Sequence, residues 1–562
     1  MSTSREILRQ DIWHVDNDVE EPASPEVISL HYARARSICK NAALSVDDIQ
    51  HLGKKFWDFH FDLIAARDMT AFIIAAIQVN LCIGTLSPFV EHRPDLRNLL
   101  GKLLSFDVCG QFMLTEVGHG LDARNLETRA TLQPDGSFDL HTPNGAAAKA
   151  MPPTTPLCGM PRVAIVFARL IVDERCHGVK PFLVSLSDGG KMTPGIISRI
   201  LPTRPGTKPL DHSMTTFKHV RLPPGALLGS IEKPKDERAE FLRQIWRVPI
   251  GTLSLSIMGI SAIKVGTYVA ATYSQRRTIT GPDGLSRTPI MEFCTQQRPI
   301  VKGWVQSIVL DKYARWAVRE FMNTSHQPLT RHALAVIFKS MVVEASSTLN
   351  ELAERCGWQG LFAFNQISQL ALTFQGNIIA EGDTLVLCIR FVSELLGERF
   401  RLPAPHDPET VLARREYHMM ATLKAKLTDI GGYVEHRSSA FNRHILPYCR
   451  PMVEAIGHRM VYDSAMEAGV CPKVLRLYER VCVGMDLSQH STDGLNLRAL
   501  MDADVRLYED VLADALRSVN HSDAEAYATA PIMSDRLWEA FFDKLQAFGN
   551  HGDLDLQIQP KL

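Results

Sequence analysis

The feature that most constrains the fold is a change in the residue pattern at Gly110. From there to about Leu222, short runs rich in β-branched residues alternate with turns, whereas helical periodicity fills the sequence on either side. Regular short runs of this kind favour a small antiparallel barrel or sandwich. The sequence therefore predicts an α+β chain in which a β module stands between helical segments.

The clearest turn of this β module is Asp135-Gly136, which lies between two alternating runs and predicts a hairpin. The module ends at Pro223-Pro224-Gly225, where the residue pattern typical of strands stops. The predicted strands are 130–132, 138–141, 163–172, 181–186, 195–201 and 214–222.

Helical patterning surrounds the β module. The segment 69–86 is apolar on nearly every face, so we expect a buried helix there. A single long helix is expected over 235–276, kinked at Pro249, and a polar loop over 278–287. The other predicted helices are 26–40, 47–61, 289–323, 330–356, 364–396, 409–427, 473–483, 497–519 and 533–549.

These elements divide the chain into four predicted segments. An N-terminal helical domain (1–109) precedes a middle antiparallel β-barrel (110–232), and a four-helix bundle follows (233–402). A proline-rich boundary then leads into a further helical domain (409–562).

Charge and cysteine usage exclude several functions. Lys and Arg total 61 against 62 Asp and Glu, so the formal charge of −1 gives no basis for a nucleic-acid partner or for binding to an anionic membrane. The 11 cysteines are scattered, without a CxxC pair, which indicates neither a metal site nor a disulfide framework. Reduced thiols in an intracellular protein are expected.

Localisation signals are few. The apolar stretches 71–86 and 248–263 are shorter than the roughly 20 residues of a membrane span, so no span is predicted. The polar, acidic N-terminus excludes a secretory signal. The last residues, Pro560-Lys561-Leu562, resemble a peroxisomal address with its small residue replaced. The alternatives are thus a peroxisomal and a cytoplasmic protein.

A glycine-rich loop, Thr115-Glu116-Val117-Gly118-His119-Gly120, follows the first predicted strand of the β module. Glycines let the backbone approach a planar or anionic ligand closely, although such a loop is equally typical of a tight turn. Its continuation is more specific. The stretch 115–144, TEVGHGLDARNLETRATLQPDGSFDLHTPN, resembles the flavin-binding β module of the acyl-CoA oxidases.

The resemblance extends from about residue 60 to 400. The stretch 176–184 resembles a family strand, and Tyr273-Ser274-Gln275-Arg276-Arg277 stands where these enzymes end a bundle helix with paired arginines. Arg355-Cys356-Gly357-Trp358-Gln359-Gly360 stands at the family's CGGHG turn, and Ala380-Glu381-Gly382 at its EG turn. An acyl-CoA dehydrogenase-like fold is implied, with the helix–β–helix order already inferred.

The resemblance implies FAD as cofactor and a homodimer, with Arg276 donating to the pyrophosphate across the dimer interface. Arginine suits that role because its planar fork binds phosphate through two hydrogen bonds; the alternative is a solvated pair with Arg277 at a helix end. Gln296 is either a flavin or adenine ligand or an amide on the helix surface. The implied FAD ligands are Leu114, Thr115, Gly118, Gly120, Arg276, Gln296, Gly357 and Gly360.

Glu381 is implied to be the catalytic base. In the family this glutamate removes the α-proton of an acyl thioester while the β-hydrogen leaves as hydride to flavin N5. A carboxylate can do this when desolvation raises its pKa toward that of the substrate. Glu381 follows an apolar approach and precedes a flexible Gly382. The alternative is an ordinary exposed carboxylate at a helix start.

Two departures leave the substrate open. The tryptophan-rich segment that covers the flavin in the oxidases is replaced by 149–156, KAMPPTTP, whose prolines favour an irregular loop over a strand. The family's acyl-CoA segment is replaced by 209–216, PLDHSMTT.

The small alanines before Met151 leave room for O2, so an oxidase that releases hydrogen peroxide is expected. The alternatives are a flavin-dependent tailoring oxidase acting on a non-CoA metabolite and a flavin-binding homologue without activity.

Overall fold

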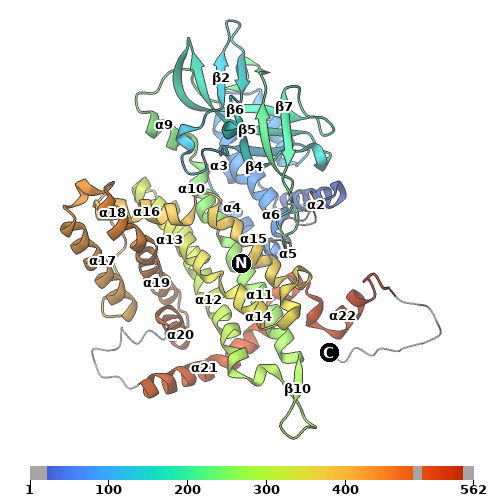
Figure 1. Ribbon diagram of the computed structural model, residues 1–562, viewed down its shortest axis with the longest axis vertical. Coiled ribbons are helices and arrows are strands. Elements are labelled where there is room, and N and C mark those ends of the chain that lie inside the picture. The colour runs from blue at the N-terminus through green and yellow to red at the C-terminus, as the bar shows by residue number, and fades with distance from the viewer. Residues whose placement is uncertain (1–21, 485–496, 549–562) are drawn as a thin grey trace, which may run out of the picture. The chain divides into compact units, whose positions relative to one another are not determined.

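The computed structural model describes residues 22–484 and 497–548 (Figure 1). These residues form two compact units. The first holds the described residues up to His51 together with Thr70–Trp246, and the second holds Leu52–Met69 and the described residues from Arg247 onward. The division of the sequence at 109, 232 and 402 is finer than these two units and stays a prediction.

The helices before the β module converge on one buried amide. The apolar stretch forms a continuous helix made of α6 (Met69–Ala76), a π-helical turn (Ile77–Ile83) and α7 (Gly84–Leu86). Gln78 in the π turn is fully buried, donates from Nε2 to the carbonyls of Leu103 and Val108, and accepts from the Gly110 N–H. It thereby fixes the start of strand β1. The other helices here are α2 (Pro25–Ala42), α3 (Val46–Gln50) and α8 (Leu96–Leu104).

The β module is mixed rather than antiparallel, which corrects the predicted barrel. Its strands form a six-stranded sheet (β1-β5-β2-β3-β9, with β6 on β5) and a separate three-stranded sheet (β4-β8-β7). Strands β1 and β2 both run parallel to β5, because long connections return the chain to β5 in the same direction. The strands are β1 (Cys109–Met113), β2 (Arg129–Leu132), β3 (Phe138–His141), β4 (Lys149–Pro153), β5 (Arg162–Val172), β6 (Arg175–Ser187), β7 (Ile196–Ile200), β8 (His212–Phe217) and β9 (Val220–Leu222).

The Asp135-Gly136 hairpin is confirmed, since β2 and β3 pair antiparallel across it. The expectation of an irregular loop at 149–156 is wrong, because β4 pairs with β8. Two prolines are tolerated there because β4 is an edge strand, and the pairing shifts register between Ala150 and Pro153. Met151, at φ +80°, lies inside this irregularity.

The second unit is helical. The expected long helix over 235–276 is interrupted, because α9 (Glu237–Gln244) belongs to the first unit and α10 (Arg247–Ser254) and α11 (Ile257–Arg276) to the second. Pro249 lies in the first turn of α10, where the missing N–H needs no partner, so it starts a helix and does not kink one. The polar loop after α11 is instead a small hairpin of β10 (Thr278–Thr280) and β11 (Arg287–Pro289).

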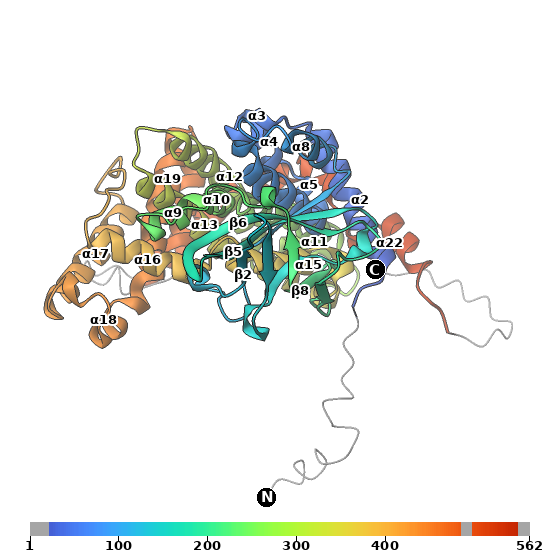
Figure 2. The same cartoon turned by 90° about the horizontal axis from the view of Figure 1, so that it is seen from above.

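The remaining helices follow the predicted stretches, mostly as shorter pieces. Helices α18 and α19 had no predicted counterpart. Helix α19 is buried along most of its length and so shows no amphipathic stripe. It packs beside α17 in both views (Figures 1 and 2). These helices are α4 (Lys54–Phe61), α5 (Ile64–Arg67), α12 (Cys294–Met322), α13 (Pro328–Ala345), α14 (Thr348–Glu354), α15 (Ile367–Ile379), α16 (Thr384–Leu396), α17 (Val411–Asp429), α18 (Ser439–His444), α19 (Cys449–Glu467), α20 (Pro472–Val483), α21 (Leu497–Asn520) and α22 (Asp535–Phe542).

Two helical stretches are long and apolar enough to cross a membrane by length and composition, Met69–Phe89 and Arg247–Arg276. Each helix extends beyond the apolar run that the sequence shows. Their most apolar windows are 89% and 83% buried inside the protein. Burial to this extent is typical of helices in the core of a protein.

A buried ion pair joins α2 to both sheets of the first unit. The Arg162 guanidinium lies 3.6 Å from the Asp211 carboxylate, and both side chains are fully buried. Tyr32 donates to Asp211 and accepts from Arg162, and Thr155 also donates to Asp211. A buried charge is tolerated only when it is paired and hydrogen-bonded in this way.

Replacing Asp211 by Asn should destabilise the first unit by about 3–5 kcal/mol, because Arg162 would keep its charge without a carboxylate. Denaturant unfolding followed by fluorescence measures this. The matched control is Asp135→Asn, which removes the exposed ion pair with Arg221 and should change stability little. Equal effects of the two substitutions would contradict the role of the buried pair.

Candidate functional site

Glu381 lies in a sharp turn between two helices of the second unit. Helix α15 ends at Ile379 and α16 begins at Thr384. Glu381 and Gly382 both adopt left-handed backbone conformations, with φ of +54° and +94°. A non-glycine residue in this conformation carries backbone strain, which persists only where the surroundings hold it and which clusters at functional sites.

Three successive carbonyls of this turn are held by side chains from other helices. The Lys339 ammonium on α13 donates to the carbonyls of Ala380 (2.6 Å) and Gly382 (2.5 Å). The Thr252 hydroxyl on α10 donates to the Glu381 carbonyl at 2.7 Å. Lys339 is only 1% exposed. The turn is thus fixed by a buried cation and a hydroxyl.

The Glu381 carboxyl packs directly on Gly251 of α10. A Cβ at position 251 would lie 2.5 Å from the Glu381 Cδ, so only glycine leaves room for this side chain. Burial raises the pKa of Glu381 to about 8, against the opposing effect of Lys339. Burial likewise lowers the pKa of Lys339 to about 8 while Glu381 and Asp383 raise it. A desolvated carboxyl of this kind suits general-base chemistry near neutral pH.

Lys339, Thr252 and Gly251 were not found from the sequence. Lys339 carried a usable signal, because it is the single charge in the run Ala333–Val343, whose other residues are apolar except Ser340. Its partners carried none, since a threonine and a glycine in a helix are ordinary residues.

A second cluster joins the end of α11, the start of α12 and the turn at 355–360. Gln296 donates from Nε2 to the Ser274 hydroxyl (2.7 Å) and to the Arg355 carbonyl (2.8 Å). Both amide hydrogens are therefore used in holding the cluster together, and only the amide oxygen remains for a ligand. Three buried donors of this cluster have no hydrogen-bond partner among the described residues: Arg276 Nε, Arg355 Nε and Gln359 Nε2.

Arg276 contacts the C-terminal part of the same chain. Its guanidinium donates to the Ile532 carbonyl at 2.9 Å and forms an ion pair with Asp535. The segment around α22 is held nearby by stacking of Phe541 on Phe364, with ring centroids 4.3 Å apart. The predicted phosphate contact of Arg276 thus stays a prediction, and an anion there would compete with Asp535.

The two glycines of the 355–360 turn serve different purposes. Gly357 is left-handed (φ +60°) with open space where a Cβ would lie. A Cβ on Gly360 would lie 1.8 Å from the Ala353 carbonyl oxygen, so this glycine is required by packing alone.

The glycine-rich loop of the first unit is built on another buried ion pair. Lys149 and Glu116 are both fully buried, 3.0 Å apart, and Glu116 also accepts from the N–H groups of Glu127 and Thr128. Lys149 donates further to the carbonyls of Leu114 and Phe167. This network fixes the loop against β2 and β5.

The predicted ligands in this loop differ in what they offer. The Gly118 N–H donates to the Ala146 carbonyl at 2.8 Å, so it is not free to bind a ligand, and a Cβ there would lie 2.9 Å from the Ala146 Cβ. Gly120 is exposed, with open space around it. Leu114 and Thr115 are half-buried at the end of β1.

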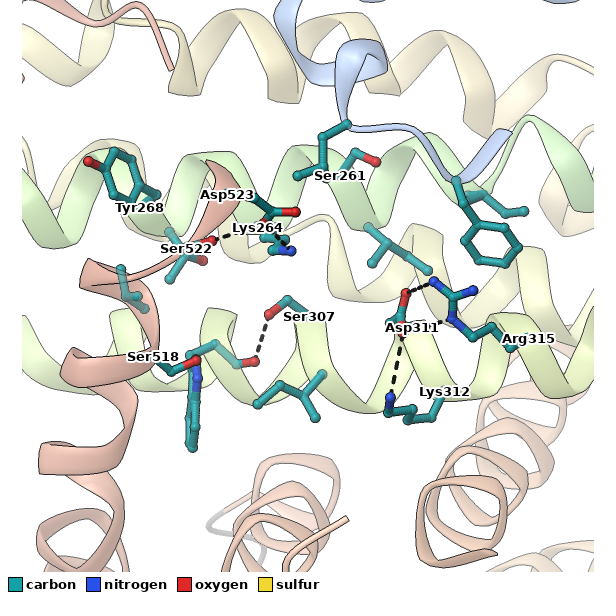
Figure 3. A pocket seen from close by; sticks show the side chains of 18 residues that line it. Ser261, Lys264, Tyr268, Ser307, Asp311, Lys312, Arg315, Ser518, Ser522 and Asp523 are labelled. Atoms are coloured by element: carbon teal, nitrogen blue, oxygen red, sulfur yellow. Dashed lines mark hydrogen bonds and ion pairs between the residues drawn. The ribbon is translucent and has the colours of Figure 1, made fainter. Parts of the chain in front are cut away.

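A cavity of about 320 Å³ lies between α11 and α12 in the second unit (Figure 3). Its charged side chains are joined in ion pairs, Lys264 with Asp523 and Asp311 with Lys312 and Arg315. Glu381 is not among its lining residues. The charges of this cavity are thus already matched among the described residues, and the buried Glu381 carboxyl lies elsewhere.

No protein-family model matches the chain. It is 26% identical to human peroxisomal acyl-coenzyme A oxidase 3 over 387 residues, which cover 60% of this chain and 55% of that protein. The chain thus spans about half the length of the curated relatives it matches.

Solved structures show the same fold. Acyl-CoA oxidase 3 from Yarrowia lipolytica superposes with a TM-score of 0.75 at 17% identity, covering 96% of this chain and 87% of that one. Acyl-CoA oxidase 2 of Caenorhabditis elegans, bound with FAD, ascaroside-CoA and ATP, superposes with a TM-score of 0.69 at 16% identity, covering 94% of both chains.

The helices, the β module and the glutamate turn together define the class of the acyl-CoA dehydrogenase-like fold. Within that class the chain is similar to acyl-CoA oxidases, both in sequence, at about 26% identity, and in fold. The resemblance carried by its sequence motifs is confirmed.

The pKa directions of Glu381 and Lys339 predict a stability minimum near pH 8. Folded Glu381 keeps its proton from pH 4.5 to about 8, so the folded state binds more protons and the free energy of unfolding falls as pH rises. Folded Lys339 gives up its proton between about 8 and 10.5, where the free energy of unfolding rises again.

Each slope is at most about 1.4 kcal/mol per pH unit. Glu381→Gln should remove the fall, which denaturant unfolding across this pH range measures. Parallel curves for wild type and variant would contradict the pKa direction.

Proposed function

We propose that the protein is an FAD-dependent oxidase that introduces an α,β-double bond into an acyl thioester. The observation that carries the proposal is the desolvated Glu381 carboxyl, held on a strained turn by Lys339 and Thr252. The names of the relatives favour a thioester over a non-CoA metabolite, because they are acyl-coenzyme A oxidases.

Glu381 would remove the α-proton of the bound thioester. Its raised pKa matches it to a weak carbon acid, and the Gly251 surface holds the carboxyl in one place. Lys339 is a positioning residue, since its ammonium binds the carbonyls on both sides of Glu381. FAD, when bound, would supply the acceptor for the β-hydrogen and the route of the electrons to O2, with hydrogen peroxide as product.

The residues present fit a dinucleotide. Arg276, Arg355 and Gln359 offer buried N–H donors without partners, which suit the anionic diphosphate part. Gly357 leaves open space beside them, and the amide oxygen of Gln296 remains for a polar edge. Leu114, Thr115 and Gly120 of the glycine-rich loop stay expected flavin ligands. Arg276 would act on the cofactor of a second copy in a homodimer.

The segment 209–216, which replaces the family's acyl-CoA segment, is built into the fold of the first unit. Asp211 and Thr215 in this segment are fully buried and bonded to Arg162 and Thr154. These side chains support the fold and are not free to contact a substrate. Human acyl-coenzyme A oxidase 3 is peroxisomal by name, and peroxisomal import of this chain stays a prediction, because Pro560-Lys561-Leu562 lies outside the described residues.

Glu381→Gln should retain flavin while turnover of acyl-CoA falls about a hundredfold or more, because the amide cannot accept the proton. Peroxide release under air and flavin bleaching without air are the readouts. Glu394→Gln on α16 is the matched control, since Glu394 pairs with Arg390, and should keep full turnover. Full turnover by Glu381→Gln would refute its role as the base.

Arg276 and Asp535 should affect flavin binding in opposite directions. Arg276→Ala removes a donor for the phosphate, so FAD affinity should fall about tenfold, the scale of one charge-assisted hydrogen bond. Asp535→Asn releases the same guanidinium from its carboxylate, so affinity should rise. Titration of FAD into the flavin-free protein measures both, and equal affinities in the two variants would remove Arg276 from the site.

A further inference from the structure

An exposed tryptophan lies in the turn at 355–360, between α14 and α15. The Trp358 side chain is 60% exposed, although tryptophan is a residue that folded proteins bury to a large extent. The family's CGGHG turn has a glycine at this position, so the indole is a feature of this chain. The family pattern therefore assigns no role to it.

Aromatic rings on two sides hold the Trp358 indole in place. Its ring centroid lies 5.9 Å from that of Phe362 and 6.3 Å from that of Trp538, with interplanar angles of 83° and 77°. Trp538 in turn contacts Phe541, which stacks on Phe364. Neither contact of the indole is a parallel stack, and the ring is largely exposed. It is thus fixed in orientation and still accessible to a further planar group.

The indole and the Arg276 guanidinium contact neighbouring positions on α22. Asp535 and Trp538 are three residues apart, about 4.5 Å along the helix axis, and so lie on one face of α22. Asp535 forms the ion pair with Arg276, and Trp538 contacts Trp358. One face of α22 therefore brings together an aromatic ring and a cation suited to phosphate.

Hydrogen-bond donors without partners lie in the same turn as the indole. Gln359 is 3% exposed, and its Nε2 has no partner among the described residues. The Nε of Arg355 is in the same state. Gly357 is exposed, with open space where a Cβ would lie. An apolar protein partner would leave these donors unsatisfied, whereas a ligand with an oxygen-rich anionic part would satisfy them.

We propose that Trp358 is a stacking platform for the adenine ring of FAD. The inference rests on the proposed FAD-dependent function and adds to it the residue that recognises the adenine. The adenine lies on the indole, and the diphosphate, on the other side of the ribose, reaches Arg276 and the donors of the turn. A base binds an aromatic side chain through its π-face and through the apolar surface that both bury. The ligand thereby covers the exposed indole.

Fragments of the cofactor test the platform on the flavin-free full chain. Calorimetric titration with FAD, ADP and FMN measures the affinity for the whole cofactor, for the part with adenine and for the part without it. Trp358→Leu should weaken FAD and ADP binding about tenfold, the scale of one base–aromatic stack, and leave FMN binding unchanged. Trp358→Phe keeps a ring and should retain most of the ADP affinity. Leu361→Ala is the matched control, because Leu361 is 77% exposed in the same turn and carries no ring. It should leave all three affinities unchanged.

The outcomes separate this inference from the proposed function. Unchanged FAD affinity in Trp358→Leu would overturn the platform and leave the FAD-dependent function standing, whereas a wild-type chain that binds no FAD would overturn both. An equal loss of FMN and FAD affinity would show that the indole only supports the fold of the turn, which also overturns the platform. Sedimentation velocity on the same samples addresses a protein contact. If Trp358→Leu dissociates a dimer without changing the ADP affinity, the indole binds a second copy and the platform is refuted.

Discussion

The bond between the Lys339 ammonium and the carbonyls on either side of Glu381 is the interaction on which the candidate site depends. A turn with two left-handed residues between α15 and α16 is strained, and an isolated chain would relax it. The lysine nitrogen lies 2.5–2.6 Å from both carbonyl oxygens, and the side chain is almost fully buried. If the turn relaxed, the buried ammonium would lose these hydrogen-bond acceptors, which is unfavourable. The strained geometry is thereby the lower-energy choice, and the carboxyl is held over Gly251.

The same device recurs in the first unit. Lys149 with Glu116 fixes the glycine-rich loop, and Arg162 with Asp211 joins α2 to the β module. Each pair is fully buried and receives additional hydrogen bonds, so removing either member leaves a charge without compensation. In both units, buried cations therefore hold loops that hydrophobic packing alone would leave free to move. This explains why two segments that depart from the family pattern, 149–156 and 209–216, still have ordered positions: each places a buried member of an ion pair, Lys149 or Asp211.

Sequence patterns predicted those features that depend on local periodicity or on a motif. The hairpin at Asp135-Gly136 was predictable because few residue pairs adopt the backbone conformation of a tight hairpin turn, and Asp-Gly is one of them. The buried helix at 69–86 follows from apolar residues on every face. Prediction failed where a partner decided the outcome. Strand β4 forms despite its prolines because β8 offers an edge, and α19 gave no pattern because helices surround it.

The sequence by itself determined the order of helices and strands, the resemblance to the acyl-CoA oxidases, and the position of the glutamate turn, because short contiguous stretches encode these features. Only the tertiary structure decided what each site residue does. Gly118 and Gly360, which the sequence suggested as ligands, are required by packing against Ala146 and Ala353. Lys339 is 42 residues before Glu381 in the sequence, yet its ammonium binds the carbonyls of Ala380 and Gly382 on either side of Glu381. Such contacts arise from the packing of distant helices, which no local pattern encodes.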